Sequence, residues 1–393
     1  MNISTNAKSL QNQIVKWRRD LHSMPEIGLE LKHTTKYICE VLEDLGIKYT
    51  KIAQNSGIVA LIRGNNNEKV IALRADMDAV NIKEKTGLSY ASTNSNMHAC
   101  GHDAHIAMLL GAAKILNKIR DSLECSVKLI FQPDEEGSKG ARLMIENGVL
   151  ENPKVNVILG THIGQLSKEI ECGHIGVRIG EIMASNDKFK ITINGKECHG
   201  AMPDTGIDSI LIASHIVLGL QSIISRELNP INPTVITVGK FISGNQYNIV
   251  SGSAEIEGTV RAYNSEDRNF VLKRIGEISK LISESMRASC NYEVVLGSPV
   301  VKNDKEFTLK FVKSAEKIVG KNKIKFIQNP VMAGEDMGFY LNKVSGTFFF
   351  LGGFNKDKGI TYPHHNSKFN IDEDVLWIGS ALLAQSTLDY CNN

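Results

Sequence analysis

The segment MHACGHDAH, residues 97–105, concentrates side chains that bind metals: three histidines, one cysteine and one aspartate. Only Gly101 separates Cys100 from His102, and a glycine permits a turn in which both side chains face one point. Thiolate sulfur and imidazole nitrogen are common ligands of divalent transition metals. The segment therefore predicts part of a metal site whose other ligands come from distant parts of the chain.

Three further segments offer ligands next to apolar runs. PDEEG holds the adjacent carboxylates Glu135 and Glu136. VNVILGTHIG is a predicted strand that ends at His162, and YPHHNSKF holds His364 and His365. One glutamate can bind a metal while its neighbour faces a reacting water, and either of the paired histidines can complete the set.

Five mixed sulfur, nitrogen and oxygen ligands exceed the need of one tetrahedral ion and suit two divalent cations with open positions. Two such ions ~3.5–4 Å apart can activate one water and polarise a carbonyl, and the spare carboxylate would act as general base. Taken singly, a buried histidine is usually a hydrogen-bonded core residue, and paired glutamates are usually solvated. A structural zinc site would use four closed ligands, mostly cysteines at short spacings. One cysteine among several carboxylates favours an open, catalytic site.

The elements that position these residues alternate between strand and helix up to about residue 165. This alternation predicts an α/β domain whose mixed sheet is flanked by helices, with functional groups gathered beyond the carboxyl ends of its strands. From about residue 182 the pattern changes to two helices and about four strands, and α/β character returns near residue 299. We predict a catalytic domain over 1–181 and 299–393 and an inserted α+β sandwich over 182–298.

The composition is that of a globular protein, with 393 residues, 42% hydrophobic and 22% charged. A formal net charge of +2 gives no electrostatic argument for nucleic acid or a membrane surface as partner. No stretch approaches the ~20 apolar residues of a membrane span, and the N-terminus lacks the pattern of a secretion signal. The seven cysteines are scattered, which predicts free thiols in a reducing, cytoplasmic compartment.

Several motifs, in order along nearly the whole chain, resemble the M20 metallopeptidase family. They are LHSMPEIGLEL, ALRADMDAV, MHACGHDAHIAMLLGAA, LIFQPDEEGSKGARLMIENG and GTHIG. The similarity is greatest to the amidohydrolase branch, which includes aminoacylases, hippurate hydrolases and auxin-conjugate hydrolases. The resemblance implies a di-metal catalytic domain and a smaller inserted domain that closes over substrate and makes a dimer contact. It also implies hydrolysis of a small-molecule N-acyl amino acid to a free acid and an amino acid.

The resemblance assigns roles to the candidate site residues. The ligands of two divalent ions, Zn²⁺ or Mn²⁺ with Co²⁺ or Ni²⁺ also compatible, would be Cys100, His102, Glu136, His162 and His365. Glu135 would be the general base that deprotonates the water shared by the ions and then protonates the leaving amine. His365 is preferred to His364 because the family's ligand lies four residues before an aromatic residue, here Phe369.

Four other residues match family positions near the substrate. Asp78 would orient a ligand, and His199, in KECHGAMPDTGIDSI, would steady the oxyanion from its own or the partner subunit. Asn248 would make a polar substrate contact. Arg261 would clamp a substrate carboxylate, although a surface salt bridge is nearly as reasonable for it.

The chain also departs from the family pattern, at Val80, Asn81, Asp134, Asp204, Ser209, Ser251, Gly334, Met337 and Ser367. None of these removes a proposed ligand or Glu135, so the chemistry is expected to be intact while the acyl and amino-acid preference is open. A dipeptidase on the same scaffold and a non-catalytic, metal-stabilised binding protein are the alternatives. A homodimer is expected from the resemblance. The apolar helix at 207–224 is its only support in the residues, and that helix could equally pack within its own domain.

Overall fold

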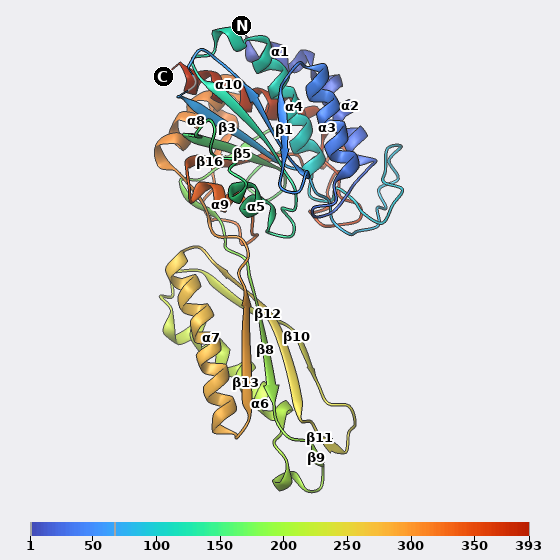
Figure 1. Cartoon of the computed structure of the whole chain (residues 1–393), viewed down its shortest axis with the longest axis vertical. Helices are drawn as coiled ribbons and strands as arrows, with labels where there is room; N and C mark the ends of the chain where they lie inside the picture. Colours follow the sequence, from blue (N-terminus) through green and yellow to red (C-terminus); the bar gives the residue numbers. More distant parts are fainter. Residues whose placement is uncertain (1, 67, 393) are drawn as a thin grey trace. The chain divides into compact units, whose positions relative to one another are not determined.

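The computed structural model describes residues 2–66 and 68–392. They form two compact units (Figure 1). The first unit is built from Met1–Ile182, Val301–Val331 and Asp336–Asn393, and the second from Met183–Val300 and Met332–Glu335. The short stretch Met332–Glu335 is the main difference from the expected division, which assigned it to the catalytic domain. No sequence pattern marks so short a return to the other unit.

The first unit contains an eight-stranded mixed sheet in the order β1-β2-β4-β3-β5-β16-β6-β15. Its strands are β1 (Tyr49–Ile52), β2 (Gly57–Ile62), β3 (Val70–Asp76), β4 (Ser126–Gln132), β5 (Val157–Gly164), β6 (Ile175–Val177), β15 (Ile324–Phe326) and β16 (Ser345–Gly352). The four central strands run parallel. Parallel strands therefore bring the carboxyl ends of β3, β4 and β5 to one edge of the sheet, where the predicted site residues follow them. A separate ribbon pairs β7 (Gly180–Met183) with β14 (Val301–Asn303).

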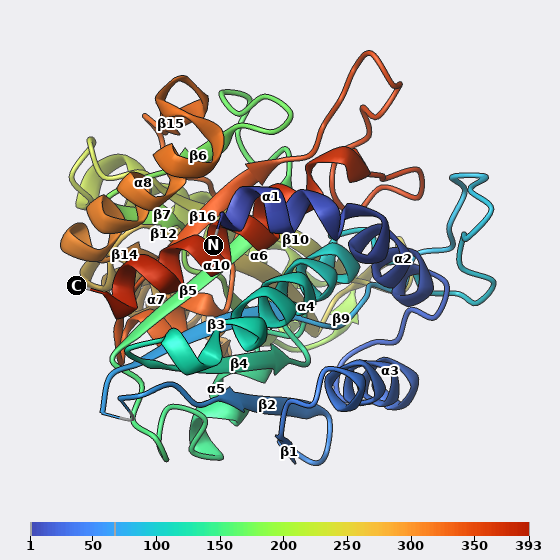
Figure 2. The ribbon, with the colours of Figure 1, turned by 90° about the horizontal axis from the view of Figure 1, so that it is seen from above.

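Helices cover both faces of this sheet (Figures 1 and 2). They are α1 (Ile3–Ser9), α2 (Gln11–His22), α3 (Lys32–Asp44), α4 (His102–Lys118), α5 (Gly140–Glu146), α8 (Lys305–Val319), α9 (Met337–Leu341) and α10 (Leu376–Cys391). α4 packs between α2 and α10 on one face, while α5 and α9 pack together on the other. The predicted α/β architecture with a mixed sheet is confirmed.

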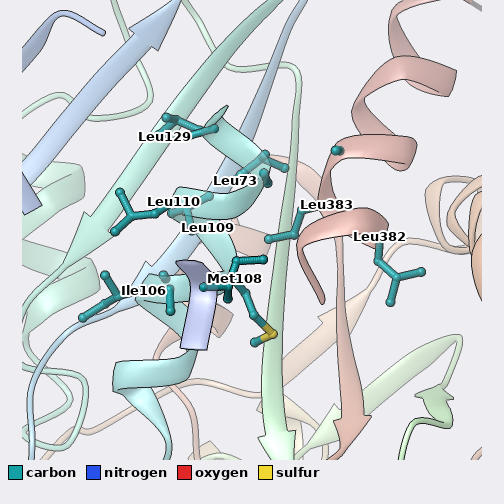
Figure 3. Packing of buried hydrophobic residues seen from close by; sticks show 14 of the residues in the cluster. Leu73, Ile106, Met108, Leu109, Leu110, Leu129, Leu382 and Leu383 are labelled. Atoms are coloured by element: carbon teal, nitrogen blue, oxygen red, sulfur yellow. The ribbon is translucent and has the colours of Figure 1, made fainter. Parts of the chain in front are cut away.

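The main hydrophobic core lies between the sheet and α4 (Figure 3). Leu73 and Leu129 project from the sheet toward α4, and Leu382 and Leu383 come from α10. Nearly every side chain of α4 is buried, as expected for a helix that is apolar on all sides. The core therefore fixes the position of α4, and with it the position of His102, the first residue of this helix.

The amino-terminal segment forms two helices, because the chain turns at Leu10 between α1 and α2. The next helix, α3, begins without a side-chain cap from its own first residues. The Glu26 carboxylate accepts hydrogen bonds from the backbone N–H groups of His33 and Thr34 instead. A carboxylate satisfies the unpaired N–H groups there and interacts favourably with the helix dipole.

The second unit contains a four-stranded antiparallel sheet in the order β10-β12-β8-β13. Its elements are β8 (Asp187–Asn194), α6 (Ser209–Ser222), β10 (Thr234–Ser243), β12 (Ser253–Ala262), α7 (Ser265–Ser285) and β13 (Ser289–Val295). A small ribbon of β9 (Cys198–His199) and β11 (Ile249–Val250) extends from one end. Both helices pack on the sheet around a separate apolar core. The predicted two helices and four strands are present.

The expectation that no stretch is apolar enough to span a membrane is wrong for α6 and the π-helical turn Ile223–Glu227 that follows it. Ser209–Glu227 passes that test by length and composition alone. Ile212, Ile216 and Leu220 are buried in the core of the second unit. Core helices have the same composition, so one such helix is weak evidence for a membrane span.

The expectation of free thiols is wrong for two of the seven cysteines. Cys125, next to the start of β4, forms a disulfide with Cys391 at the end of α10. Cys39, Cys100, Cys172, Cys198 and Cys290 are free. The two bonded residues are 266 positions apart, and only the packing of α10 beside the sheet brings them together. The cytoplasmic location stays a prediction.

Candidate metal centre

The five predicted metal ligands come from four segments of the first unit. Cys100 lies in the turn before α4, and His102 is the first residue of α4. Glu136 lies in the loop after β4, and His162 lies inside β5 rather than at its end. His365 lies in the loop between β16 and α10. Segments up to 265 residues apart in the chain thus supply one site.

The ligand atoms form overlapping groups, in each of which all atoms lie within 4.8 Å of one another. The groups are Cys100–His102–His162, Cys100–Glu136–His365 and His102–Glu135–Glu136. Cys100 Sγ lies 3.4 Å from His162 Nε2, and His365 Nε2 lies 3.0 Å from Glu136 Oε1. Cys100 is common to the first two groups. The arrangement therefore offers two adjoining positions for cations.

Backbone conformation explains how two of these ligands reach the site. Gly101 has φ +83°, and a Cβ there would lie 2.9 Å from Ile163 Cγ2, so the predicted need for glycine is confirmed. His365 also has a positive φ of +60°, a conformation in which histidine is enriched among non-glycine residues. Its backbone N–H donates to the carbonyl oxygen of Ala99 at 2.9 Å. This bond holds the loop against the MHACGHDAH turn.

Asp78 is fully buried and organises the glutamate pair. Its two carboxylate oxygens accept the backbone N–H groups of Glu135 at 2.9 Å and Glu136 at 3.1 Å. Its carbonyl oxygen accepts from His102 Nδ1 at 2.8 Å, which leaves His102 Nε2 to face the site. Asp78 thus orients the predicted ligand His102 directly and fixes the loop that carries the predicted ligand Glu136.

Replacing Asp78 by asparagine should lower kcat/KM by about 10–100-fold, as changes to residues behind metal ligands do. The amide has one oxygen for two N–H donors, so its NH₂ group would face a backbone N–H. Steady-state kinetics and metal content measure the effect. Asp208→Asn is the matched control, because the Asp208 carboxylate also accepts two backbone N–H groups, at the start of α6. Wild-type kinetics in Asp78→Asn would contradict this role.

The buried carboxylates of the site produce a negative electrostatic environment that favours bound cations. Burial, together with the nearby Glu136 and Glu135 carboxylates, raises the pKa of the Cys100 thiol well above its usual range. Burial opposes protonation of His102, but Asp76 and Asp78 outweigh it and raise the pKa of His102 to about 10. Burial and neighbouring histidines lower the pKa of His162, which keeps that imidazole neutral. A bound divalent ion would offset the negative charge and deprotonate the thiol.

A buried nitrogen without a hydrogen-bond partner also indicates that the donor set fits a metal. His102 Nε2 is buried and has no hydrogen-bond partner among residues 2–66 and 68–392. It lies 3.9 Å from both Asp76 Oδ2 and Glu135 Oε2. Buried polar atoms are rarely left unpaired unless an ion or water completes them. A divalent ion bound by His102 would satisfy this nitrogen.

The structure separates the paired histidines. His364 packs against Gly164, and its Nε2 lies 2.9 Å from the carbonyl oxygen of Ile163. Its ring is tilted against that of Phe369, with centroids 4.9 Å apart. Burial lowers the pKa of His364 to about 4. His365 instead points its Nε2 at Glu136. His365 therefore joins the ligand group, and His364 packs behind His162.

Asp134, which stands where the family usually has alanine, has a local explanation. Its φ is +52°, where aspartate is tolerated far better than most residues. A Cβ on Gly137 would lie 2.1 Å from Asp134 Oδ1, so this side chain folds back over its own loop. The departure concerns the turn that presents Glu135 and Glu136, and it leaves both in place.

The remaining predicted residues belong to the second unit, and they do not lie together. His199 and Asn248 are neighbours at the β9–β11 ribbon, where Gly200 N–H donates to the Asn248 carbonyl oxygen. The exposed His199 ring accepts from Ala201 N–H at Nδ1, which leaves Nε2 as a hydrogen-bond donor. The ribbon lies near the Ser253 end of β12, whereas Arg261 lies near the other end of that strand. Arg261 is eight residues beyond Ser253, so the two residues are roughly 26 Å apart at about 3.3 Å per residue. One small substrate cannot contact both ends.

Arg261 makes no salt bridge in the described part of the chain. The alternative role given for it above, a surface salt bridge, therefore finds no partner among the described residues. Its Nη1 atom is buried and unpartnered among the described residues, and burial lowers the pKa of the guanidinium. A Cβ on Gly334 would lie 3.1 Å from this nitrogen. A guanidinium in this state favours an anionic ligand.

Sequence reasoning missed several buried residues behind the ligands. Arg74 pairs with both Asp76 and Asp336 at 2.7 Å, and His105 Nδ1 lies 2.5 Å from Asp76 Oδ1. The spacing of three between His102 and His105 was a usable signal, since residues three apart share one helix face. Nothing in the sequence pattern pointed to Asp336.

Comparison with known proteins agrees with this geometry. The chain is 38% identical over 383 residues to an N-acetyl-L-cysteine deacetylase of Bacillus subtilis (strain 168), covering 97% of this chain and 89% of that protein. It is 35% identical over 398 residues to thermostable carboxypeptidase 1 of Saccharolobus solfataricus, covering 99% and 98%. The crystal structure of the Bacillus subtilis YXEP protein, described as a dinuclear metal binding peptidase from the M20 family, matches with TM-score 0.81 and 32% identity over 97% of this chain and 98% of that one. Residues 72–389 match the model of peptidase family M20/M25/M40. The chain belongs to peptidase family M20/M25/M40, and it is by that membership a hydrolase.

Proposed function

We propose that the protein is a metal-dependent amidohydrolase that cleaves the amide bond of N-acyl amino acids. The observation that carries the proposal is the convergence of Cys100, His102, Glu136, His162 and His365, with Glu135 beside them. This donor set suits two divalent ions such as Zn²⁺ or Mn²⁺, and Co²⁺ or Ni²⁺ would also fit. The deacetylase relative supports an acylated amino acid as substrate.

The protein's own residues move the protons of this reaction. Two divalent ions held by the five ligands would supply Lewis-acid polarisation and lower the pKa of a water molecule. Glu135 takes a proton from the water while the water oxygen forms a bond to the acyl carbon of the substrate. The carbon–nitrogen bond then breaks, and Glu135 returns the proton to the leaving amine. Asp78 holds the Glu135 backbone throughout.

A substrate panel tests the proposal against its nearest alternative. Metal-depleted protein is reconstituted with Zn²⁺ or Mn²⁺ and assayed on N-acetyl and N-benzoyl amino acids, on dipeptides, and on longer peptides with free carboxyl ends. Hydrolysis of the N-acyl compounds at least about tenfold faster than peptides, in kcat/KM, supports the proposal. Faster release of carboxyl-terminal residues from peptides would favour a carboxypeptidase, which the archaeal relative makes the second candidate.

Arg261 is proposed to bind the substrate carboxylate. Arg261→Lys loses the bidentate geometry and should raise KM for an N-acyl amino acid by about tenfold or more, since hydrogen bonds to charged groups contribute ~1.5–3 kcal/mol. An N-acyl amino acid amide, which lacks the carboxylate, should respond little to the substitution. Arg226→Lys is the matched control, because Arg226 is exposed in the π-helical turn Ile223–Glu227 that follows α6. Equal effects on both substrates would rule out the carboxylate contact.

His199 and Asn248 are proposed to act in the site of a partner subunit. They lie at the end of the second unit opposite Arg261, so one chain cannot apply all three to one small substrate. This is tested by mixing Glu135→Gln subunits with His199→Ala subunits. If the site is shared, a 1:1 mixture of a symmetric dimer should regain up to about a quarter of wild-type activity. If His199 serves its own chain, the mixture stays inactive.

A further inference from the structure

His105, the third histidine of MHACGHDAH, has no role in the proposed reaction, yet it lies between the two histidine ligands. Its ring stacks on that of His102, with centroids 5.4 Å apart, and meets the edge of His162 at 4.8 Å. We propose that His105 is a positioning residue that sets the placement of His102 and His162 and thereby the affinity of their shared metal position. The inference rests on the proposed metal centre but not on the identity of the substrate.

Hydrogen bonds at both ring nitrogens fix His105 in one tautomer. Ile163 N–H donates to His105 Nε2 at 2.9 Å, so that nitrogen carries a lone pair. Nδ1 therefore carries the hydrogen and donates to Asp76 Oδ1 at 2.5 Å. Because both nitrogens are engaged, His105 is not itself free to bind a metal, although its atoms lie close enough to those of His102 and Asp76.

Asp76 is held in turn from its other side. Its Oδ2 atom accepts from Arg74 Nη1 at 2.7 Å, and a second nitrogen of Arg74 donates to Asp336. Arg74, Asp76 and Asp336 are fully buried, and His105 is 1% exposed. A buried and fully paired chain of polar groups has few alternative arrangements. The His105 ring is therefore fixed between α4, β3 and β5.

The consequence for the metal follows from which residues His105 contacts. His102 lies three residues earlier on the same face of α4, and Ile163 directly follows His162 in β5. Both histidines belong to the ligand group that also contains Cys100. Loss of the bond to Ile163 would let α4 and β5 shift relative to one another at the point where each supplies a ligand. Loss of the bond to Asp76 in β3 would let the His105 ring turn away from Ile163. His98 is equally buried in the same motif, neither of its ring nitrogens has a hydrogen-bond partner in the described part of the chain, and it therefore offers a matched control.

The experiment compares metal affinity in folded variants. His105→Gln retains an acceptor near the Nε2 position and His105→Asn retains a donor near the Nδ1 position, so each loses one of the two bonds. Zn²⁺ affinity of the apoproteins is measured by competition with a chromophoric chelator, and apoprotein melting is recorded in parallel. We expect both variants to lose about 10–100-fold in affinity for one of the two ions. His98→Gln should stay within about twofold of the wild type, since it loses no hydrogen bond.

Zn²⁺ affinity within twofold of the wild type in both His105 variants would overturn the proposal, as would an equal loss in His98→Gln. Wild-type protein with ¹⁵N-labelled histidine supplies a test that needs no variant to fold. The proposal requires the Nδ1–H tautomer of His105 in both apoprotein and metal-loaded protein, and an Nε2–H tautomer contradicts it. If the wild type binds two ions but cleaves no N-acyl amino acid, the proposed function fails while these measurements still decide the role of His105.

Discussion

Replacing Glu135 by glutamine is expected to lower kcat by about 10²–10⁴-fold, the usual contribution of a general base, with metal content unchanged. Glutamine has nearly the same shape but cannot accept a proton from water. The Glu135 carboxylate lies 3.9 Å from His102 Nε2, and its backbone is fixed by Asp78, so the substitution should leave the loop in place. Metal analysis and N-acyl amino acid hydrolysis on one preparation measure both effects.

Glu136→Gln is the control from the same loop. The Glu136 carboxylate faces His365 Nε2 and belongs to the ligand group of Cys100. Its replacement should lower metal content as well as activity. Loss of metal identifies a ligand, whereas loss of activity with unchanged metal content identifies the general base. Retention of more than about a tenth of wild-type kcat in Glu135→Gln would exclude that residue as general base.

The sequence predicted those parts of the fold whose residues carry a local pattern. Continuous apolar runs bounded by turn residues identified β2 to β5, because central strands are buried on both faces. Three-residue strands such as β6 and β15 carry too few residues for any periodicity. The break between α1 and α2 has no glycine or proline to mark it. The Cys125–Cys391 bond joins elements that only the folded core brings together.

The candidate site divides in a similar way. Ligand types and their placement next to apolar runs were enough to nominate Cys100, His102, His162 and one of the pair Glu135 and Glu136. The assignment of Glu136 as the ligand and of Glu135 as the base needed the resemblance. The choice of His365 over His364 needed the resemblance, and the structure gives it a physical basis in the positive φ of His365 and the contact of His364 with Ile163. The sequence alone assigned no role to Asp76, the last residue of β3.

The role of Asp76 depends on its partners, Arg74 and His105, which come from β3 itself and from α4. The role of a side chain that positions another side chain depends on which partners it meets in the folded structure, and its residue type alone does not reveal them. A single sequence therefore reveals ligands more readily than the residues that position them. The opposite placement of His199 and Arg261 in the second unit is likewise a property of strand register, which sets how far apart two residues lie along one sheet.

Cys100 is expected to be the most sensitive ligand, because it alone belongs to both the His102–His162 group and the Glu136–His365 group. Cys100→Ala should bind fewer than one ion per chain where the wild type binds about two. Loss of Lewis-acid assistance worth several kcal/mol should lower kcat/KM by about 10³-fold or more. Inductively coupled plasma analysis and steady-state kinetics measure the two quantities.

His365→Ala distinguishes a shared ligand from an ordinary one. It removes a ligand from one group only, and Cys100, His102 and His162 remain, so about one ion per chain should stay bound. Cys290→Ala, a free cysteine in the second unit, controls for the loss of a thiol and should keep both ions. If Cys100→Ala and His365→Ala retain the same number of ions, Cys100 serves one position only. The closeness of Cys100 to both groups would then reflect packing alone, with no ligand role for its thiolate in the second position.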